Sequence, residues 1–229
     1  LIHIHNPLIG FLVLLQPSLW KIPKVYHFHS SWFDEERINA GGIARIPLNL
    51  KLRLEMIRIM EWVCYRFSKT LLFLSEYSKN RFKDYYSLSN PNLVIIPGGV
   101  DLKVFHLLKP EENKKAIREK LNLQKEVPLI LTVRRLEERM GLENLILAVE
   151  ILLKKDHAKN FQLAIVGKGS LRQRLEDLIV EKKLFDTIQL TGLVPKKTLP
   201  LYFRAADLFV LPTTDIEGFG LVTAEAFAS

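Results

Sequence analysis

Short apolar runs alternate with longer segments of helical periodicity along the whole chain. The runs are continuous and rich in Leu, Ile and Val, as in strands that are covered on both faces of a sheet. Eight runs are expected to form strands: 1–5, 24–29, 70–75, 92–97, 128–133, 161–166, 187–191 and 207–212. Eight further segments are expected to form helices: 7–19, 47–67, 78–86, 111–121, 143–155, 171–183, 197–206 and 220–229. This alternation predicts an α/β protein with parallel sheets and right-handed crossovers.

A polar stretch that contains a proline, at residues 101–115, separates four predicted strands from the next four. We therefore expect two Rossmann-like, doubly wound domains, residues 1–108 and 109–229, that face a cleft. Open α/β sheets bind ligands at the carboxyl ends of their strands, so this cleft is the expected ligand site.

Composition narrows the class of protein. The 229 residues are 48% apolar and 25% charged, as in ordinary globular proteins. The single cysteine, Cys64, excludes a disulfide within the chain and a cysteine-based zinc site. A net charge of +8 permits contact with phosphorylated ligands or anionic lipid, but no basic run is interleaved with aromatic residues, so nucleic acid is not an expected partner.

The two ends of the chain and the length of its apolar runs indicate where in the cell the protein is expected. No apolar run reaches the ~20 residues that span a bilayer. The chain begins at Leu1 without a methionine and stops at Ser229 inside a helical pattern, so we expect a fragment that lacks both termini of a longer protein. A cytoplasmic location is expected.

The most informative segment is PTTDIEGFGLVTAE, residues 212–225. A strand ends there, a loop carries Glu217, and Gly218 and Gly220 flank Phe219 before a helix that includes Leu221 and Glu225. Glycines at a helix start let backbone N–H groups approach a phosphate, and carboxylates accept hydrogen bonds from sugar hydroxyls. The alternative is an ordinary helix start rich in acidic residues.

Other candidate residues carry weaker signals. Arg135 follows an apolar run, and its guanidinium suits phosphate oxygens, although surface arginines are common. Gly167 and Gly169 follow another run and form either a tight turn or a close backbone approach to a nucleotide. The histidine pairs at 3/5 and 27/29 each point to one face of a strand. A metal site there is conceivable, but structural histidines are the preferred interpretation and no metal is expected.

Six segments, taken together and in order, resemble the retaining glycosyltransferases of family 4 (group 1), which have the GT-B fold. Glu217 and Glu225 match the E-x7-E motif of that family. The other matching segments are HFHSSW (27–32), IPGGVDLKVF (96–105), TVRRLEERMGL (132–142), IVGKG (165–169), and GLVP with YFRAADLFVLP (192–212).

The resemblance implies roles for particular residues. Glu217 lies beside the transferred sugar, Glu225 holds the ribose, Arg135 binds the donor diphosphate, and His29 contacts sugar or acceptor in the cleft. Gly167, Gly169 and the segment from Gly218 to Leu221 approach the donor, and Val194 offers backbone groups to the base. The family usually has a second phosphate-binding cation where this chain has Met140, so Arg139 or Arg134 is the expected substitute.

The resemblance also implies an activity. The expected reaction moves a hexose-type sugar from a UDP- or GDP-sugar to a glycan or lipid-linked acceptor of the cell envelope, with retention and without a metal or other cofactor. The rival interpretations are a sugar-nucleotide epimerase of the same architecture and a non-catalytic nucleotide-sugar binder. A dinucleotide oxidoreductase is disfavoured because neither domain opens with G-x-G-x-x-G after its first strand.

The predicted helix 47–67 has two open interpretations. Leu48, Leu52, Met56, Ile59 and Val63 recur at helical spacing, with Lys51, Arg53, Arg58 and Arg66 around them. Such a helix either packs in a core with its cations reaching outward or lies on an anionic membrane. The second interpretation would place the protein at the inner membrane face as a peripheral partner of lipid.

Overall fold

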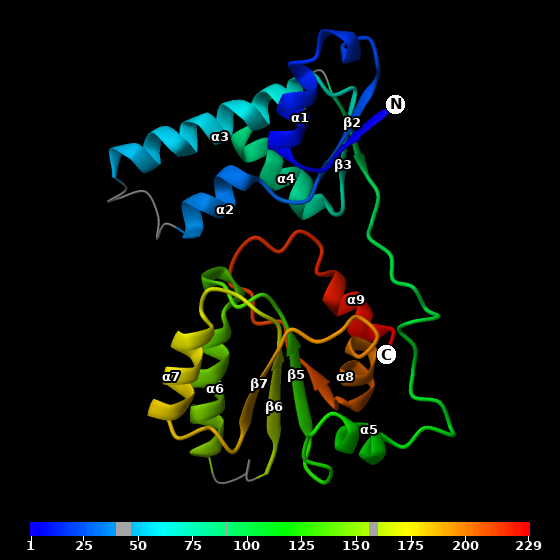
Figure 1. The fold of residues 1–229 in the computed structure, drawn as a ribbon, viewed down its shortest axis with the longest axis vertical. Helices are drawn as coiled ribbons and strands as arrows, with labels where there is room; N and C mark the ends of the chain where they lie inside the picture. Colours follow the sequence, from blue (N-terminus) through cyan, green and yellow to red (C-terminus); the bar gives the residue numbers. More distant parts are fainter. Residues whose placement is uncertain (40–46, 90, 156–159) are drawn as a thin grey trace. The chain divides into compact units, whose positions relative to one another are not determined.

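The computed structural model describes residues 1–39, 47–89, 91–155 and 160–229. The chain forms two compact units, each with its own parallel sheet (Figure 1). The first unit comprises Leu1–Gly98 together with Ile216–Phe219, and the second comprises Gly99–Asp215 and Gly220–Ser229. The predicted α/β class with two parallel sheets is confirmed.

The sheet of the first unit has four parallel strands in chain order. They are β1 (Ile2–Ile4), β2 (Lys24–Phe28), β3 (Thr70–Phe73) and β4 (Asn92–Ile95), and each lies inside a predicted run. Because the strands follow one another in order, right-handed crossovers place the connecting helices on one face of the sheet.

The helices of the first unit are α1 (Pro7–Leu14), the 3-10 helix η1 (Pro17–Leu19), α2 (Trp32–Asn39), α3 (Leu48–Arg66) and α4 (Glu76–Tyr85). The pattern predicts one helix over 7–19, but Pro17 has no N–H for the helical ladder, so the helix ends before it and a 3-10 turn follows. Helix α2 is not among the predicted helices, because its sequence WFDEERIN is short and half of its residues are charged.

One face of the first sheet forms the core of this unit. Strand residues Ile4, Tyr26, Phe28, Leu71 and Phe73 are buried there against side chains of α1, α3 and α4. Side chains alternate along a strand, so His3, His5 and His27 point to the opposite face. On that face His3 and His5 are exposed and His27 is half-buried.

Helix α3 buries a different stripe from the one that its apolar periodicity predicts. Its fully buried positions include Leu54, Ile57, Glu61 and Cys64. The predicted stripe of Leu48, Leu52, Met56 and Ile59 is exposed, with 60% of Leu52 and 61% of Met56 accessible. The core interpretation of that stripe is therefore wrong for these four residues.

The sheet of the second unit has the order β7-β6-β5-β8. Its strands are β5 (Leu129–Val133), β6 (Gln162–Val166), β7 (Ile188–Gly192) and β8 (Leu208–Phe209). The chain moves outward from β5 to β7 and then returns to pair β8 with the other edge of β5. This reversal between β5 and β8 is a topological switch point, where ligands bind outside the carboxyl ends of the strands.

Helices cover both faces of the second sheet (Figure 1). They are α5 (Lys114–Lys120), the 3-10 helix η3 (Glu138–Met140), α6 (Leu142–Leu153), α7 (Arg172–Glu181), α8 (Leu199–Ala205) and α9 (Leu221–Phe227). One apolar cluster joins α6 and α7 to the sheet, and a second cluster joins α5 and α8 to its other face. These clusters hold the strand ends of the switch point in place.

The predicted boundary at residues 108/109 differs from the division of the structure, which falls after Gly98. Phe105 and Leu108 pack against the second apolar cluster of the second unit, and the rings of Phe105 and Phe203 lie 5.7 Å apart. Although residues 101–115 are mostly polar, these two apolar side chains pack into the second unit, so the stretch belongs to that unit.

Candidate functional site

Two loops meet at the switch point of the second unit. The loop after β5 begins with Arg134 and Arg135, and the loop after β8 contains Thr213 and Thr214. The Arg134 guanidinium donates to Thr213 Oγ1, and Thr214 N donates to the Arg139 carbonyl at 3.0 Å. Arg135 is exposed. The structure thus places the predicted diphosphate-binding arginine at the edge where this fold binds ligands.

The glycine turn after β6 packs directly on the loop after β5. A Cβ atom at Gly167 would lie 1.8 Å from the Arg134 carbonyl oxygen, and one at Gly169 would lie 2.3 Å from the Leu136 carbonyl oxygen. Leu136 N also donates to Lys168 O at 3.0 Å. The two glycines therefore allow backbone to approach backbone, and their approach to a nucleotide remains a prediction.

The structure shows the surroundings of Met140, which stands where the family usually has a second phosphate-binding cation, and of Arg139, its expected substitute. Met140 is 3% exposed and belongs to the apolar cluster beneath α6, and Arg139 itself is 7% exposed. Gly141, which follows, has a left-handed φ of 66°, and a Cβ there would lie 2.0 Å from the Pro212 carbonyl oxygen. Gly141 was not a candidate at the sequence level, although it is the glycine that lets the loops after β5 and β8 touch.

Glu225 lies on α9 with an unsatisfied carboxylate oxygen. Its Oε2 is buried and has no hydrogen-bond partner among the described residues. Burial raises the pKa of Glu225. A buried acceptor without a donor is expensive unless a ligand or water supplies one, so this oxygen is suited to receive a hydroxyl. Leu221 at the start of α9 is exposed, and Val194 is half-buried beside the second apolar cluster.

The segment Ile216–Phe219 belongs to the first unit and carries Glu217. Ile216 is buried and has a φ of 51°, which is rare for a β-branched residue and costs backbone strain. Ser75 Oγ donates to the Gly218 carbonyl, and a Cβ at Gly218 would lie 2.9 Å from the His29 carbonyl oxygen. The structure therefore brings together two predicted site residues, Gly218 and His29, around a small cavity whose lining includes Ser31 and Arg81.

His29 shares a hydrogen bond with a second histidine. Its Nε2 lies 3.0 Å from Nδ1 of His5. Burial lowers the pKa of His29, and the neighbouring His5 and His3 lower it further. At neutral pH the ring is therefore uncharged, with one nitrogen as donor and the other as acceptor.

Glu61 of α3 holds the loop that follows His29. Its carboxylate accepts hydrogen bonds from Ser31 Oγ at 2.9 Å and from the backbone N–H groups of Trp32 and Phe33 at 2.6 and 3.3 Å. The hydroxyls of Tyr65 and Tyr86 donate to it as well. Sequence reasoning missed Glu61, and the available signal was one carboxylate within the otherwise apolar run MEWVC.

Asp34 is a second buried carboxylate beside the small cavity. Its two oxygens accept from Arg37 at 2.7 Å, from Arg81 at 2.9 Å and from the Tyr85 hydroxyl at 2.8 Å. Arg81 comes from α4, so the charge of Asp34 fixes the start of α2 to α4. Sequence reasoning missed this residue as well, because helix α2 was not predicted.

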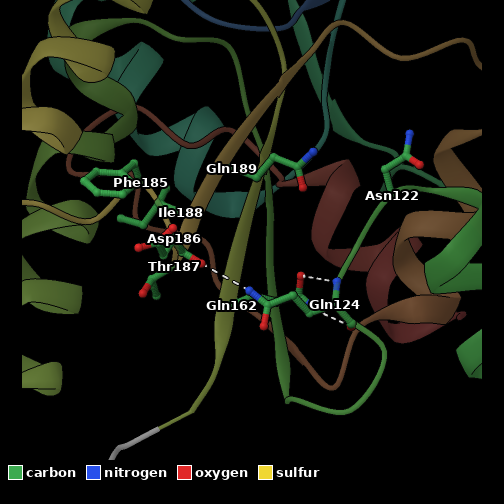
Figure 2. A pocket seen from close by; sticks show the side chains of 8 residues that line it. All are labelled: Asn122, Gln124, Gln162, Phe185, Asp186, Thr187, Ile188 and Gln189. Atoms are coloured by element: carbon green, nitrogen blue, oxygen red, sulfur yellow. Dashed lines mark hydrogen bonds between the residues drawn. The ribbon is translucent and has the colours of Figure 1, made fainter.

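A separate hollow lies at the opposite end of the second sheet, where β6 and β7 begin (Figure 2). Two of its amide side chains, those of Gln124 and Gln162, are hydrogen-bonded to backbone groups. The Gln162 side chain accepts from Gln124 N at 3.0 Å and donates to Gln124 O at 2.6 Å, and the Gln124 amide donates to Asp186 O at 3.1 Å. Because it lies at the amino ends of the strands, this hollow is not the predicted donor site.

Comparison with known families gives matches over most of the chain. The profile of "Glycosyl transferases group 1" matches residues 113–229, and that of "Glycosyltransferase Family 4" matches residues 1–104. These two spans lie largely in the second and the first unit, respectively.

Individual proteins agree with the family profiles. A GDP-mannose-dependent monoacylated alpha-(1-6)-phosphatidylinositol monomannoside mannosyltransferase of Corynebacterium glutamicum is 32% identical over 165 residues, which are 69% of this chain and 42% of that protein. An alpha-monoglucosyldiacylglycerol synthase of Streptococcus pneumoniae is 24% identical, over 91% of this chain and 45% of that protein. The chain spans about half the length of the curated relatives it matches.

Solved structures show the same fold. The structure of HepE from Anabaena in complex with UDP-glucose aligns with a TM-score of 0.77 at 18% identity, covering 99% of this chain and 57% of that one.

Proposed function

Because the chain belongs to the group 1 glycosyl transferases, we propose that the whole protein moves a hexose-type sugar from a nucleoside-diphosphate sugar to a glycan or lipid-linked acceptor. The observation that carries this proposal is the buried Oε2 of Glu225, which has no hydrogen-bond partner among the described residues, on the helix that follows the loop after β8. The relatives named above use GDP-mannose or make glucolipid, and HepE binds UDP-glucose, which supports a nucleotide-sugar donor.

In this proposal the second unit binds the donor. Glu225 accepts hydrogen bonds from the ribose hydroxyls, Arg135 binds the diphosphate, and the turn of Gly167 and Gly169 approaches the nucleotide. Val194 contacts the base through its backbone. Arg139 or Arg134 substitutes for the lysine of the family, and Arg134 already reaches toward the loop after β8 through Thr213.

The proposed reaction retains the anomeric configuration. The acceptor hydroxyl attacks the anomeric carbon from the face that the diphosphate leaves, the glycosidic bond to the diphosphate breaks, and a diphosphate oxygen takes the hydroxyl proton. Glu217 and His29 bind the sugar or the acceptor, and Arg135 stabilises the negative charge of the leaving group. No metal or cofactor takes part. The epimerase and the non-catalytic binder are not favoured, because the relatives described above are transferases or synthases of glycoconjugates.

The test separates the two carboxylates of the motif in the full-length protein. Glu225→Ala should weaken UDP or GDP binding by about 1–3 kcal/mol, because ribose hydroxyls lose their acceptor. Glu217→Ala should leave nucleotide affinity unchanged and lower the rate of sugar transfer. Calorimetry with UDP and GDP measures the first effect, and product formation from the donor sugars measures the second.

The exposed Glu181→Ala is the control and should alter neither quantity. If the two effects are exchanged, the assignment of the carboxylates is wrong. If Glu225→Ala binds both nucleotides like the wild type, the donor site lies elsewhere.

We also propose a peripheral contact with the cytoplasmic face of the membrane. Among the described residues, no helix combines the length and apolar character needed to cross a bilayer. The exposed apolar stripe of α3 is flanked by the exposed cations Lys51, Arg53 and Arg58, a combination that suits an anionic lipid surface. Helix α1, which packs against α3, exposes Leu8, Ile9 and Leu12, and Leu15 directly after it is exposed as well.

A further inference from the structure

Three histidines gather on the face of the first sheet opposite its core. Strands β1 and β2 are parallel neighbours, with His3 in register with Val25. His5 follows directly after β1, and its ring lies beside that of His27 of β2. All three side chains lie on the same face of the sheet. One ring nitrogen of each of His3, His5 and His27 lies within 4.8 Å of those of the other two.

The rings are arranged in a compact group. The ring centroids of His3 and His5 lie 4.2 Å apart, those of His5 and His27 lie 5.2 Å apart, and those of His3 and His27 lie 5.8 Å apart. Tetrahedral zinc with Zn–N bonds of ~2.0–2.1 Å needs ligand nitrogens ~3.4 Å apart. The ring nitrogens, at up to 4.8 Å, must approach one another to reach that spacing. The side chains of His3 and His5 are exposed and lie outside the apolar core, so core packing does not hold their rings apart.

The outer contact of His5 matches what zinc-bound imidazoles usually have. A ligating histidine generally uses its second ring nitrogen for a hydrogen bond that fixes the ring orientation. Nδ1 of His5 is already held at 3.0 Å from Nε2 of His29. With this bond retained, Nε2 of His5 is the nitrogen that remains for a metal.

We propose that His3, His5 and His27 bind one divalent zinc ion, with water in the fourth position. Imidazole nitrogen is a preferred ligand of zinc, whereas magnesium and calcium prefer oxygen. Cys64 plays no part, because it is buried on the core face. The proposed site is distinct from the sugar-transfer reaction and does not depend on the proposed function. It touches that machinery at His29, through the hydrogen bond between His5 and His29 and through the stacked rings of His27 and His29, whose centroids lie 4.3 Å apart.

The experiment titrates zinc into the purified protein, prepared without a polyhistidine tag and freed of metal with a chelator. Calorimetry should show one zinc ion bound per chain, and the thermal midpoint should rise with zinc but not with magnesium. His3→Gln, His5→Gln and His27→Gln should each weaken zinc binding at least tenfold. His106→Gln is the matched control, since His106 lies in the second unit, and it should bind like the wild type.

Thermal unfolding of each variant without metal checks folding. If His27→Gln does not fold, the exposed His3→Gln decides, because its side chain contributes nothing to the core. The proposal is overturned if no zinc binds or if several ions bind weakly. It is also overturned if the variants of His3, His5 and His27 lose no more zinc affinity than His106→Gln.

Discussion

At the residue scale, glycines place the loops of the donor unit. Gly169 is not among the glycines with a positive φ, so its requirement for glycine comes from the close approach of the Leu136 backbone, whose O, C and N atoms would lie 2.3, 2.6 and 2.6 Å from a Cβ atom. Gly169→Ala should lower the free energy of unfolding by about 1–3 kcal/mol, because a Cβ atom forces the two loops apart. Urea unfolding measures the change.

Gly99→Ala is the control for this substitution, because a Cβ atom there meets nothing within 4 Å. It should leave stability unchanged or raise it slightly by restricting the unfolded chain. Equal losses in the two variants would mean that the contact with Leu136 is unimportant.

In the proposed reaction, Arg135 is the residue that stabilises the negative charge of the leaving diphosphate. Arg135→Ala should lower kcat in the full-length enzyme by about 10²–10³, the usual effect of removing one electrostatic donor. Stability should change by less than about 0.5 kcal/mol, because the side chain is exposed. Steady-state kinetics and thermal unfolding measure the two effects.

Arg135→Lys should recover part of the rate, since it restores a charge without the planar fork. Lys120→Ala, an exposed cation on α5, serves as the control. A wild-type rate in Arg135→Ala would move the diphosphate site to Arg134 or Arg139.

At the element scale, one carboxylate of α3 organises the start of α2. Glu61 accepts hydrogen bonds from the first backbone N–H groups of α2 and from two tyrosine hydroxyls of the core. Glu61→Ala should lower the free energy of unfolding by about 2–4 kcal/mol, because several buried donors lose their acceptor. Urea unfolding measures this loss.

Glu55→Ala tests the same helix at an exposed position, where the carboxylate is 4.0 Å from Arg58. A pair of this kind contributes little, so the change should stay below about 1 kcal/mol. Glu61→Gln should fall between the two alanine variants, because its amide oxygen still accepts. A loss in Glu55→Ala as large as in Glu61→Ala would contradict the assigned role.

At the scale of the whole molecule, the exposed stripe of α3 predicts binding to lipid. Sedimentation with phosphatidylglycerol vesicles should capture the protein, and phosphatidylcholine vesicles should capture less of it. Replacing both Leu52 and Met56 by Ser should lower binding about tenfold or more, because each side chain contributes ~1.5–3 kcal/mol when buried in an apolar phase. Lys51→Gln should lower binding to the anionic vesicles alone.

Val180→Ser removes an equally exposed apolar residue from α7 and should have no effect. Equal binding by the Leu52/Met56 variant and the wild type would show that the stripe faces something other than lipid.

The sequence by itself determined the strands and the α/β fold class, but not every helix: α2 was not predicted. Continuous apolar runs located the eight strands found among the described residues, because strands in parallel sheets are short and mostly apolar. It also located the loop of Arg135, the turn of Gly167 and the motif from Glu217 to Glu225. These segments combine glycine or charge with the end of a strand, and that combination is visible without coordinates.

Only the tertiary structure decided which partner each residue meets. Periodicity records that Leu52 and Met56 are apolar, but α3 turns Glu61 and Cys64 inward because they lie on the side that faces the first sheet. The parallel pairing of β1 with β2 brought His5, just after β1, beside His27, although the two lie far apart in the chain. The close approach of Gly169 to Leu136 likewise depends on the pairing of β5 with β6. Contacts between distant segments are properties of the fold, and no local pattern encodes them.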